Sequence, residues 1–134
     1  MTRFFLTATF LAALVSLTTA SVGSAQGPEC LGAPATITGS GTIVGTNGDD
    51  VIVGSAGRDV IVAQGGNDLV CGGQGDDIIL GALGDDTLAG DDGVGGPTTP
   101  GGDDLVQGQD GNDELFGEGG DDTIYGEDGD DILM

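Results

Sequence analysis

The sequence predicts an all-β solenoid built from short, stacked strands. Glycine makes up 29 of the 134 residues and aromatic residues only 4 %, so a conventional core of large side chains is not available. A nine-residue pattern also repeats through the last two thirds of the chain. Each copy carries an aliphatic residue at the same place, and one such residue per copy is buried only when the copies stack on one another.

Residues 1–25 have the layout of a secretory signal peptide. Arg3 gives a positive start, residues 4–17 form an apolar run, and small residues up to Ala25 offer a cleavage site. The alternative is a membrane anchor, but this run is interrupted by threonine and serine and is short for a span of about 20 residues. We therefore expect cleavage after Ala25, a secreted extracellular protein and no membrane span in the mature chain.

Residues 26–44 are predicted to be an N-terminal segment that includes a weak first copy at 36–44. The apolar outer face of the first half of the repeats is either covered by this segment as a cap or left for contact with a second copy or another protein. This segment holds Cys30, and the other cysteine is Cys71. In an exported chain two cysteines most often form a disulfide, and closing a loop of about 40 residues contributes on the order of 4 kcal/mol in the chain-entropy model. Two free thiols are the alternative.

Residues 45–134 hold the repeat in a constant frame, with glycine at position 4, aspartate at position 6 and an aliphatic residue at position 8. The first six residues of a unit are predicted to form a turn, because glycine permits positive φ, and the last three a short strand. Neighbouring strand side chains face opposite ways, so position 8 points into a narrow core and positions 7 and 9 point outward. The position-6 residues are Asp50, Asp59, Asp68, Asp77, Asp86, Asp104, Asp113, Asp122 and Asp131.

The pattern GGxGxDxUx resembles the RTX (hemolysin-type) calcium-binding nonapeptide repeat across residues 45–134. The resemblance implies a right-handed parallel β-roll with two nonapeptides per turn and two thin parallel sheets. It also implies calcium ions between successive turns, held by position-6 aspartates two units apart and by loop carbonyls. The nine aspartates named above are therefore the predicted metal ligands.

The residue types favour the same ion. Aspartates stacked at the strand spacing of about 4.8 Å would repel one another, and a divalent cation reverses that interaction. Carboxylate and carbonyl oxygens select calcium or magnesium over zinc or copper, and calcium accepts the flexible coordination that a loop supplies. A solvated acidic face or a disordered acidic chain is the alternative, which the periodic aliphatic residues oppose. Position 5 is Asp or Asn except at Arg58, and we predict that it is a turn residue rather than a ligand.

The repeat is interrupted within residues 90–102, where a regular unit would put Gly95 at position 6 and Pro97 at position 8. Proline cannot donate to a strand ladder, so we predict a nine-residue loop inserted into one turn. The position-6 aspartates would then pair as 50/68, 68/86, 86/113 and 113/131 on one edge and as 59/77, 77/104 and 104/122 on the other, which makes seven candidate calcium sites. If the stretch keeps its place in the coil, six pairs are complete.

Composition limits the function. A net charge of −21, with 23 acidic residues and no histidine, excludes nucleic acid and anionic lipid as natural partners and favours cations. No HExxH or GxSxG motif occurs, so we do not expect an enzyme. The sequence predicts a secreted, non-catalytic protein that folds on binding calcium. The alternatives are a calcium-stabilised adhesion or matrix module, with a protein partner or self-association, and a truncated remnant of a larger RTX protein, since the chain stops at Met134 without a cap.

Overall fold

The computed structural model describes residues 27–93 and 101–134. These residues form strands and turns without any helix, and therefore without a helix able to span a membrane. The signal peptide predicted at residues 1–25 lies outside the described residues, as does part of the interrupted stretch.

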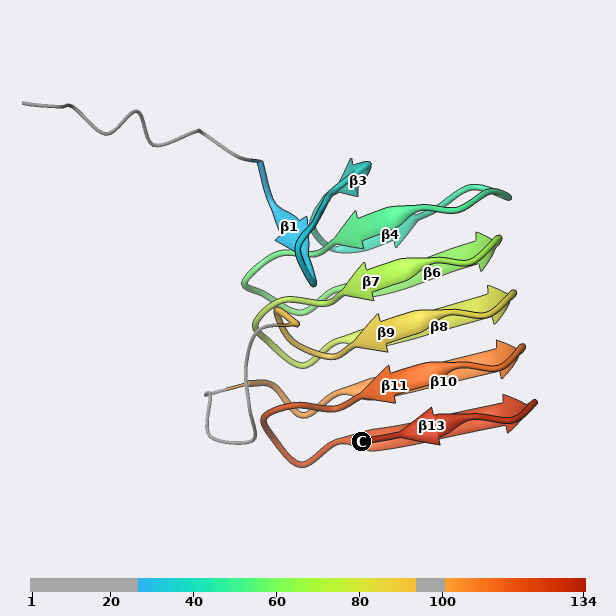
Figure 1. Cartoon of the computed structure of the whole chain (residues 1–134). Coiled ribbons are helices and arrows are strands. Elements are labelled where there is room, and N and C mark those ends of the chain that lie inside the picture. Colours follow the sequence, from blue (N-terminus) through green and yellow to red (C-terminus); the bar gives the residue numbers. More distant parts are fainter. Residues whose placement is uncertain (1–26, 94–100) are drawn as a thin grey trace, which may run out of the picture.

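The chain coils into two facing parallel sheets, shown in Figure 1. We call the first the long-strand sheet; it runs in the order β12-β10-β8-β6-β4 and contains β4 (Thr42–Val44), β6 (Val60–Gly65), β8 (Ile78–Leu83), β10 (Leu105–Asp110) and β12 (Thr123–Asp128). The short-strand sheet runs in the order β13-β11-β9-β7-β5-β3 and contains β3 (Ile37–Thr38), β5 (Val51–Val53), β7 (Leu69–Cys71), β9 (Thr87–Ala89), β11 (Glu114–Phe116) and β13 (Ile132–Leu133). Successive strands alternate between the sheets, so two nine-residue units make one turn and the predicted β-roll is confirmed.

Position 8 forms the core between the sheets, as predicted. The buried position-8 residues are Ile43, Ile52, Ile61, Val70, Ile79, Leu88, Val106 and Leu115. The strand register places Ile61 opposite Ile79 and Val70 opposite Leu88. Each side chain therefore stacks on its copies in the neighbouring turns, and this stacking is how one aliphatic residue per unit becomes fully buried.

The strand pairing across the interrupted stretch skips nine residues. β8 pairs with β10 so that Ile79 faces Val106, and β9 pairs with β11 so that Leu88 faces Leu115. The partners are 27 residues apart there, and 18 apart in the other pairs of the roll from β4 onward. This register is the one expected when nine residues loop out, and the additional residues fall in the turn that joins β9 to β10.

The coil begins at Ile37, ahead of the boundary that the sequence predicts at residue 45, because β3 pairs with β5 and β4 with β6. Before it, β1 (Glu29–Cys30) and β2 (Ala33–Pro34) form an antiparallel hairpin that contacts β5 and β7.

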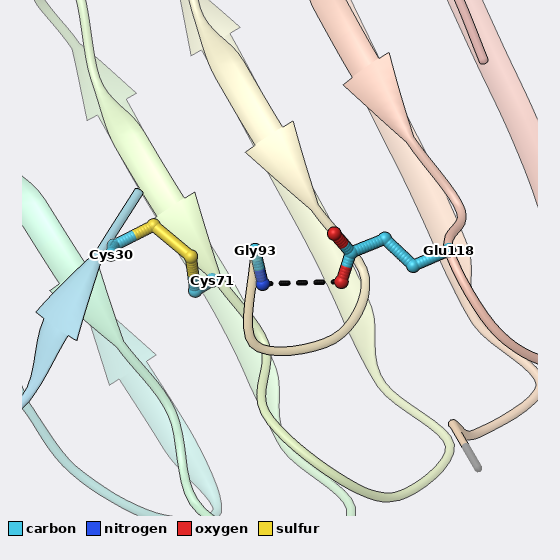
Figure 2. The surroundings of a disulfide bond; sticks show 4 residues. All are labelled: Cys30, Cys71, Gly93 and Glu118. Atoms are coloured by element: carbon cyan, nitrogen blue, oxygen red, sulfur yellow. Dashed lines mark hydrogen bonds between the residues drawn. A yellow bond between two sulfur atoms is a disulfide. The ribbon is translucent and has the colours of Figure 1, made fainter. Parts of the chain in front are cut away.

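The predicted disulfide between Cys30 and Cys71 is present, with an S–S distance of 2.03 Å, and it ties this hairpin to β7 (Figure 2). Both cysteines are buried in a cluster with Ala89, against which Val51 and Leu69 pack. The N-terminal hairpin therefore covers part of the apolar outer face of the short-strand sheet, which the sequence left without an identified contact.

Candidate metal centre

The position-6 aspartates lie at the beginning of the strands, in one column along each sheet. Seven of them are at most 8 % exposed, namely Asp50, Asp59, Asp68, Asp77, Asp86, Asp104 and Asp113. Asp122 and Asp131, in the last turn of the roll, are half-buried. Burying so many carboxylates is costly unless each finds donors or a cation.

One oxygen of each of these carboxylates beyond the first turn accepts a backbone hydrogen bond. The N–H of Asp68 donates to Oδ1 of Asp86, and the N–H of Asp86 donates to Oδ1 of Asp113, both at 2.8 Å. The same bond joins all seven pairs expected for a looped-out insertion: 50/68, 68/86, 86/113, 113/131, 59/77, 77/104 and 104/122. The structure therefore brings together every pair of aspartates that the sequence predicts to be adjacent.

The second carboxylate oxygen has no such partner in most turns. In the described part of the chain the buried oxygens without a hydrogen-bond partner are Oδ2 of Asp68, Asp77, Asp86, Asp104 and Asp113. Buried polar atoms in folded proteins are nearly always paired, and an unpaired charged oxygen costs more than a neutral one. These five oxygens are therefore the atoms at which a cation would find ligands.

Glycine at position 1 keeps the space beside these oxygens open. A Cβ added to Gly72 would lie 2.5 Å from Oδ2 of Asp77 and would also clash with the carbonyl oxygen of Gly90 in the next turn. Added Cβ atoms at Gly81, Gly90 and Gly108 would likewise clash with Oδ2 of Asp86, Asp104 and Asp113 and with the carbonyl oxygens of Gly108, Gly117 and Gly126. A carboxylate oxygen and a carbonyl oxygen thus meet at one point, and an all-oxygen ligand set suits calcium.

Few carboxylates lie at each place where a carboxylate oxygen meets a carbonyl oxygen of the next turn. Within residues 27–93 and 101–134 no three carboxylate, imidazole or thiol groups converge on a common point. A metal ion between two turns would therefore take one or two aspartates as side-chain ligands and backbone carbonyls for much of the rest. This composition agrees with the mixed ligand set that the sequence predicts, so the residues present fit a calcium ion.

Burial raises the pKa of the unpartnered aspartates. Desolvation is the main cause, and it raises the pKa of Asp77 from 3.8 to about 6 and the pKa values of Asp86 and Asp104 to about 7. Neighbouring aspartates add to these pKa shifts, while the backbone hydrogen bond to Oδ1 opposes them. A bound cation would favour the ionised form of the same groups, so protons and calcium compete for them.

The metal-free protein is expected to become more stable on acidification. Between pH 3.8 and about 7 the folded state holds protons on Asp86 and Asp104 that the unfolded chain has released, so the free energy of unfolding falls as pH rises through this window. Far-ultraviolet circular dichroism of the metal-free protein at about pH 4.5 and about pH 7.5, in about 0.5 M salt to screen exposed charges, measures the effect as a change in the folded fraction. A metal-free protein that is less stable at the lower pH would contradict the expectation. With calcium present, acidification should instead weaken calcium binding.

Position 5 lies on the exposed rim of the turns. Oδ1 of Asp49 accepts the N–H of Asn67 at 2.8 Å, and Oδ1 of Asn67 accepts the N–H of Asp85 at 3.1 Å. Along the other column, Oδ1 of Asp76 accepts the N–H of Asp103 at 3.2 Å. These oxygens already have backbone partners in neighbouring turns, which agrees with the prediction that position 5 is a turn residue.

Asp91 is a buried aspartate that the sequence reasoning missed. It is 4 % exposed, its Oδ1 accepts the N–H of Gly102 at 3.3 Å, and its Oδ2 accepts the N–H of Gly119 at 3.0 Å. These bonds close the base of the interrupted turn onto the turn that follows. The available signal was an aspartate directly after the position-1 residue Gly90, where no other unit has one.

Glu118 fixes the interrupted stretch from the next turn. Its carboxylate accepts the N–H of Gly93 at 3.1 Å, beside the disulfide (Figure 2). Burial is the main cause that raises the pKa of Glu118, and the charges of Asp92 and Asp91 raise it further. The interrupted stretch is thus tied at its start to the turn of the roll that follows it.

Comparison with known proteins gives one result. A family model described as the RTX calcium-binding nonapeptide repeat matches four times, at residues 37–70, 44–79, 65–94 and 101–133. The matches cover more than half of the chain, start at the first strand of the coil and leave out part of the interrupted stretch. No curated protein and no solved structure matches the chain.

Proposed function

Because the chain belongs to the RTX calcium-binding nonapeptide repeat family, we propose that it is a secreted, non-catalytic protein whose turns bind several calcium ions through those position-6 aspartates that have an Oδ2 without a partner. The observation that carries this proposal is the set of five buried Oδ2 atoms without a partner. Four of these atoms, Oδ2 of Asp77, Asp86, Asp104 and Asp113, lie near a backbone carbonyl oxygen of the next turn, and such pairs of oxygens suit a cation.

The metal would supply positive charge between successive turns. The chain's own groups prepare the place: Asp86 presents Oδ2, Gly81 leaves room beside it, and Gly108 of the next turn presents its carbonyl oxygen. The N–H of Asp68 holds Oδ1 of Asp86 and so fixes the direction of the carboxylate. Since the site is formed from two turns, it exists only in the folded state, and a ligand at about 100 times its Kd stabilises that state by about 2.7 kcal/mol per site.

Secretion and the lack of catalysis rest on other features. The composition of residues 1–25 and the disulfide between Cys30 and Cys71 support an exported protein in an oxidising compartment. The lack of histidine and of hydrolase motifs in the sequence supports a non-catalytic role.

Calcium titration of the metal-free mature chain tests the proposal. We expect β-type far-ultraviolet circular dichroism to increase at millimolar calcium and to fall again when EDTA is added. Magnesium at the same ionic strength is the control, and it should be much less effective because it loses its water shell reluctantly. A chain that binds no calcium by calorimetry would refute the proposal.

Asp86→Asn is expected to have opposite effects with and without calcium. Asparagine keeps an oxygen for the N–H of Asp68 but removes the buried charge, so the metal-free fold should gain stability at neutral pH. Calcium affinity at this site should fall at least about tenfold, or about 1.4 kcal/mol. Asp85→Asn is the matched control on the exposed rim and should change stability by less than about 0.5 kcal/mol. Equal losses of calcium affinity in the two variants would argue against position 6 as the ligand.

A second candidate function is an interaction module that uses the roll as a scaffold. The long-strand sheet exposes Val44 and Tyr125, which are 55 % and 51 % accessible. Calcium-dependent oligomerisation in analytical ultracentrifugation would support this function.

A further inference from the structure

The turns that carry a position-6 aspartate adopt two conformations. Positions 2 and 4 both have positive φ in turns 63–68, 72–77, 81–86, 108–113, 117–122 and 126–131; for example, φ is 88° at Ala82 and 129° at Gly84. Neither position has positive φ in turns 45–50 and 54–59. We call these the open turns and the closed turns. The turn from residue 90 to 104 belongs to neither group because it contains the insertion.

The orientation of the peptide groups in a turn decides whether a backbone N–H points at the carboxylate of its position-6 aspartate. In the first closed turn, the N–H of Thr46 donates to Oδ2 of Asp50 at 2.8 Å and its hydroxyl donates to the same atom at 2.9 Å. In the second, the N–H of Ser55 donates to Oδ2 of Asp59 at 2.6 Å. The unpartnered aspartates Asp68, Asp77, Asp86 and Asp113 all belong to open turns. The closed turns therefore satisfy their carboxylates with the chain's own donors.

A hydroxyl at position 2 distinguishes the closed turns in the sequence. Oγ1 of Thr46 accepts the N–H of Gly48, and Oγ of Ser55 accepts the N–H of Gly57, both at 3.2 Å. Serine and threonine stabilise turns through such local bonds. The open turns carry Gln, Gly, Ala or Glu at position 2, and none of these has a hydroxyl that could make the bond.

We propose that turns 45–50 and 54–59 bind no calcium and fold without it, because the hydrogen-bond donors of Thr46 and Ser55 take the place of the positive charge that the ion supplies in the open turns. The inference rests on the proposed function for the remaining turns. A cation beside Asp50 or Asp59 would have to displace an N–H whose positive end already faces the same oxygen. A serine or threonine at position 2 thus replaces an ion in this chain, and calcium binding begins at turn 63–68.

The closed turns lie in the part of the roll that the disulfide holds. Cys71 ends β7 and is bonded to Cys30 in the N-terminal hairpin, while Ile52 and Ile61, which follow the two closed turns, are fully buried. In a solenoid each repeat is stabilised by its neighbours, so folding spreads from a stable unit. The closed turns and the disulfide therefore form a calcium-independent base on which the open turns stack when calcium binds.

Calcium counting on full-length mature variants tests the proposal. Native mass spectrometry should find the same number of bound ions in Asp59→Asn as in the unmodified protein, and at least one ion fewer in Asp77→Asn and in Asp86→Asn. Loss of an ion in Asp59→Asn would overturn the inference while leaving the proposed function intact. An unmodified protein that binds no calcium would instead refute the proposed function itself.

Hydrogen exchange of the metal-free protein gives a second readout that needs no bound metal. The amides of Thr46 and Ser55 should exchange at least about tenfold more slowly than those of Gln64 and Ala82, since hydrogen-bonded amides in a stable region are protected. Ser55→Ala removes the hydroxyl and should abolish the difference in its own turn without lowering the number of bound ions. Equally fast exchange in closed and open turns of the metal-free protein would overturn the inference.

Discussion

Removal of the Cys30–Cys71 disulfide is expected to lower the free energy of unfolding of the calcium-loaded protein by about 4 kcal/mol. The cysteines are 41 residues apart, and opening a loop of that length releases chain entropy in the unfolded state. The bond joins the N-terminal hairpin to β7 and is a second covalent link between that hairpin and the roll, besides the main chain.

The disulfide also supports the interrupted stretch. A Cβ added to Gly93 would lie 2.8 Å from Sγ of Cys71 and 3.0 Å from Cδ2 of Leu31, so the stretch packs directly against the bond and the hairpin. Loss of the disulfide should therefore loosen both the hairpin and the attachment of the insertion through Glu118.

The double variant Cys30→Ala/Cys71→Ala, with saturating calcium, measures the effect. Alanine suits these buried positions, and a loss of about 4 kcal/mol should lower the Tm by roughly 15 °C or more for a domain of this size. Reductant should have the same effect on the unmodified protein and none on the double variant. A loss below about 1 kcal/mol would show that the unfolded chain gains little freedom when the loop opens.

Ile79→Ala is expected to destabilise the calcium-loaded roll by about 2–5 kcal/mol. Ile79 is fully buried, and the strand register places it between Ile61 and Val106. Each unit contributes a single large side chain to the core, so no neighbour can fill the cavity that alanine leaves. Because the loss weakens the stacking of adjacent turns, we also expect weaker calcium binding beside Asp77.

Ile78→Ala is the matched control, since Ile78 lies on the same strand but faces outward and is half-buried. It should cost clearly less, about 1 kcal/mol. Urea unfolding at saturating calcium compares the two variants. Similar losses at the two positions would show that position 8 does not carry the core.

Much of the fold follows from the sequence because the repeat is local and regular. Glycine at position 4 and an aliphatic residue at position 8 specify a turn and a strand in each unit, and Ile79 and Leu88 are buried as predicted. Pro97 at a strand position predicts the break, and the pairing of Leu88 with Leu115 has the register expected for a looped-out segment. A one-residue shift would expose every core side chain, so the register has little freedom.

The site followed from the sequence less completely. The pattern identifies position 6 and brings the correct aspartates together, but it treats all nine as equivalent. The structure separates Asp50 and Asp59, whose Oδ2 atoms are hydrogen-bonded, from aspartates such as Asp86, whose Oδ2 is not. Thr46 and Ser55 are visible in the sequence, but their effect depends on the direction of peptide groups within the turn.

The sequence by itself determined the period and the core positions, because both depend on residue type and spacing alone. It favoured the disulfide and, given the β-roll that the RTX resemblance implies, the pairs of aspartates that become neighbours, but it left two free thiols and a six-pair coil open. Only the tertiary structure decided which carboxylate oxygens lack a partner, which outer face the hairpin covers, and that Asp91 closes the base of the insertion. These features depend on contacts between residues up to 41 positions apart, and on the sign of φ in the turns, which a nine-residue pattern does not encode.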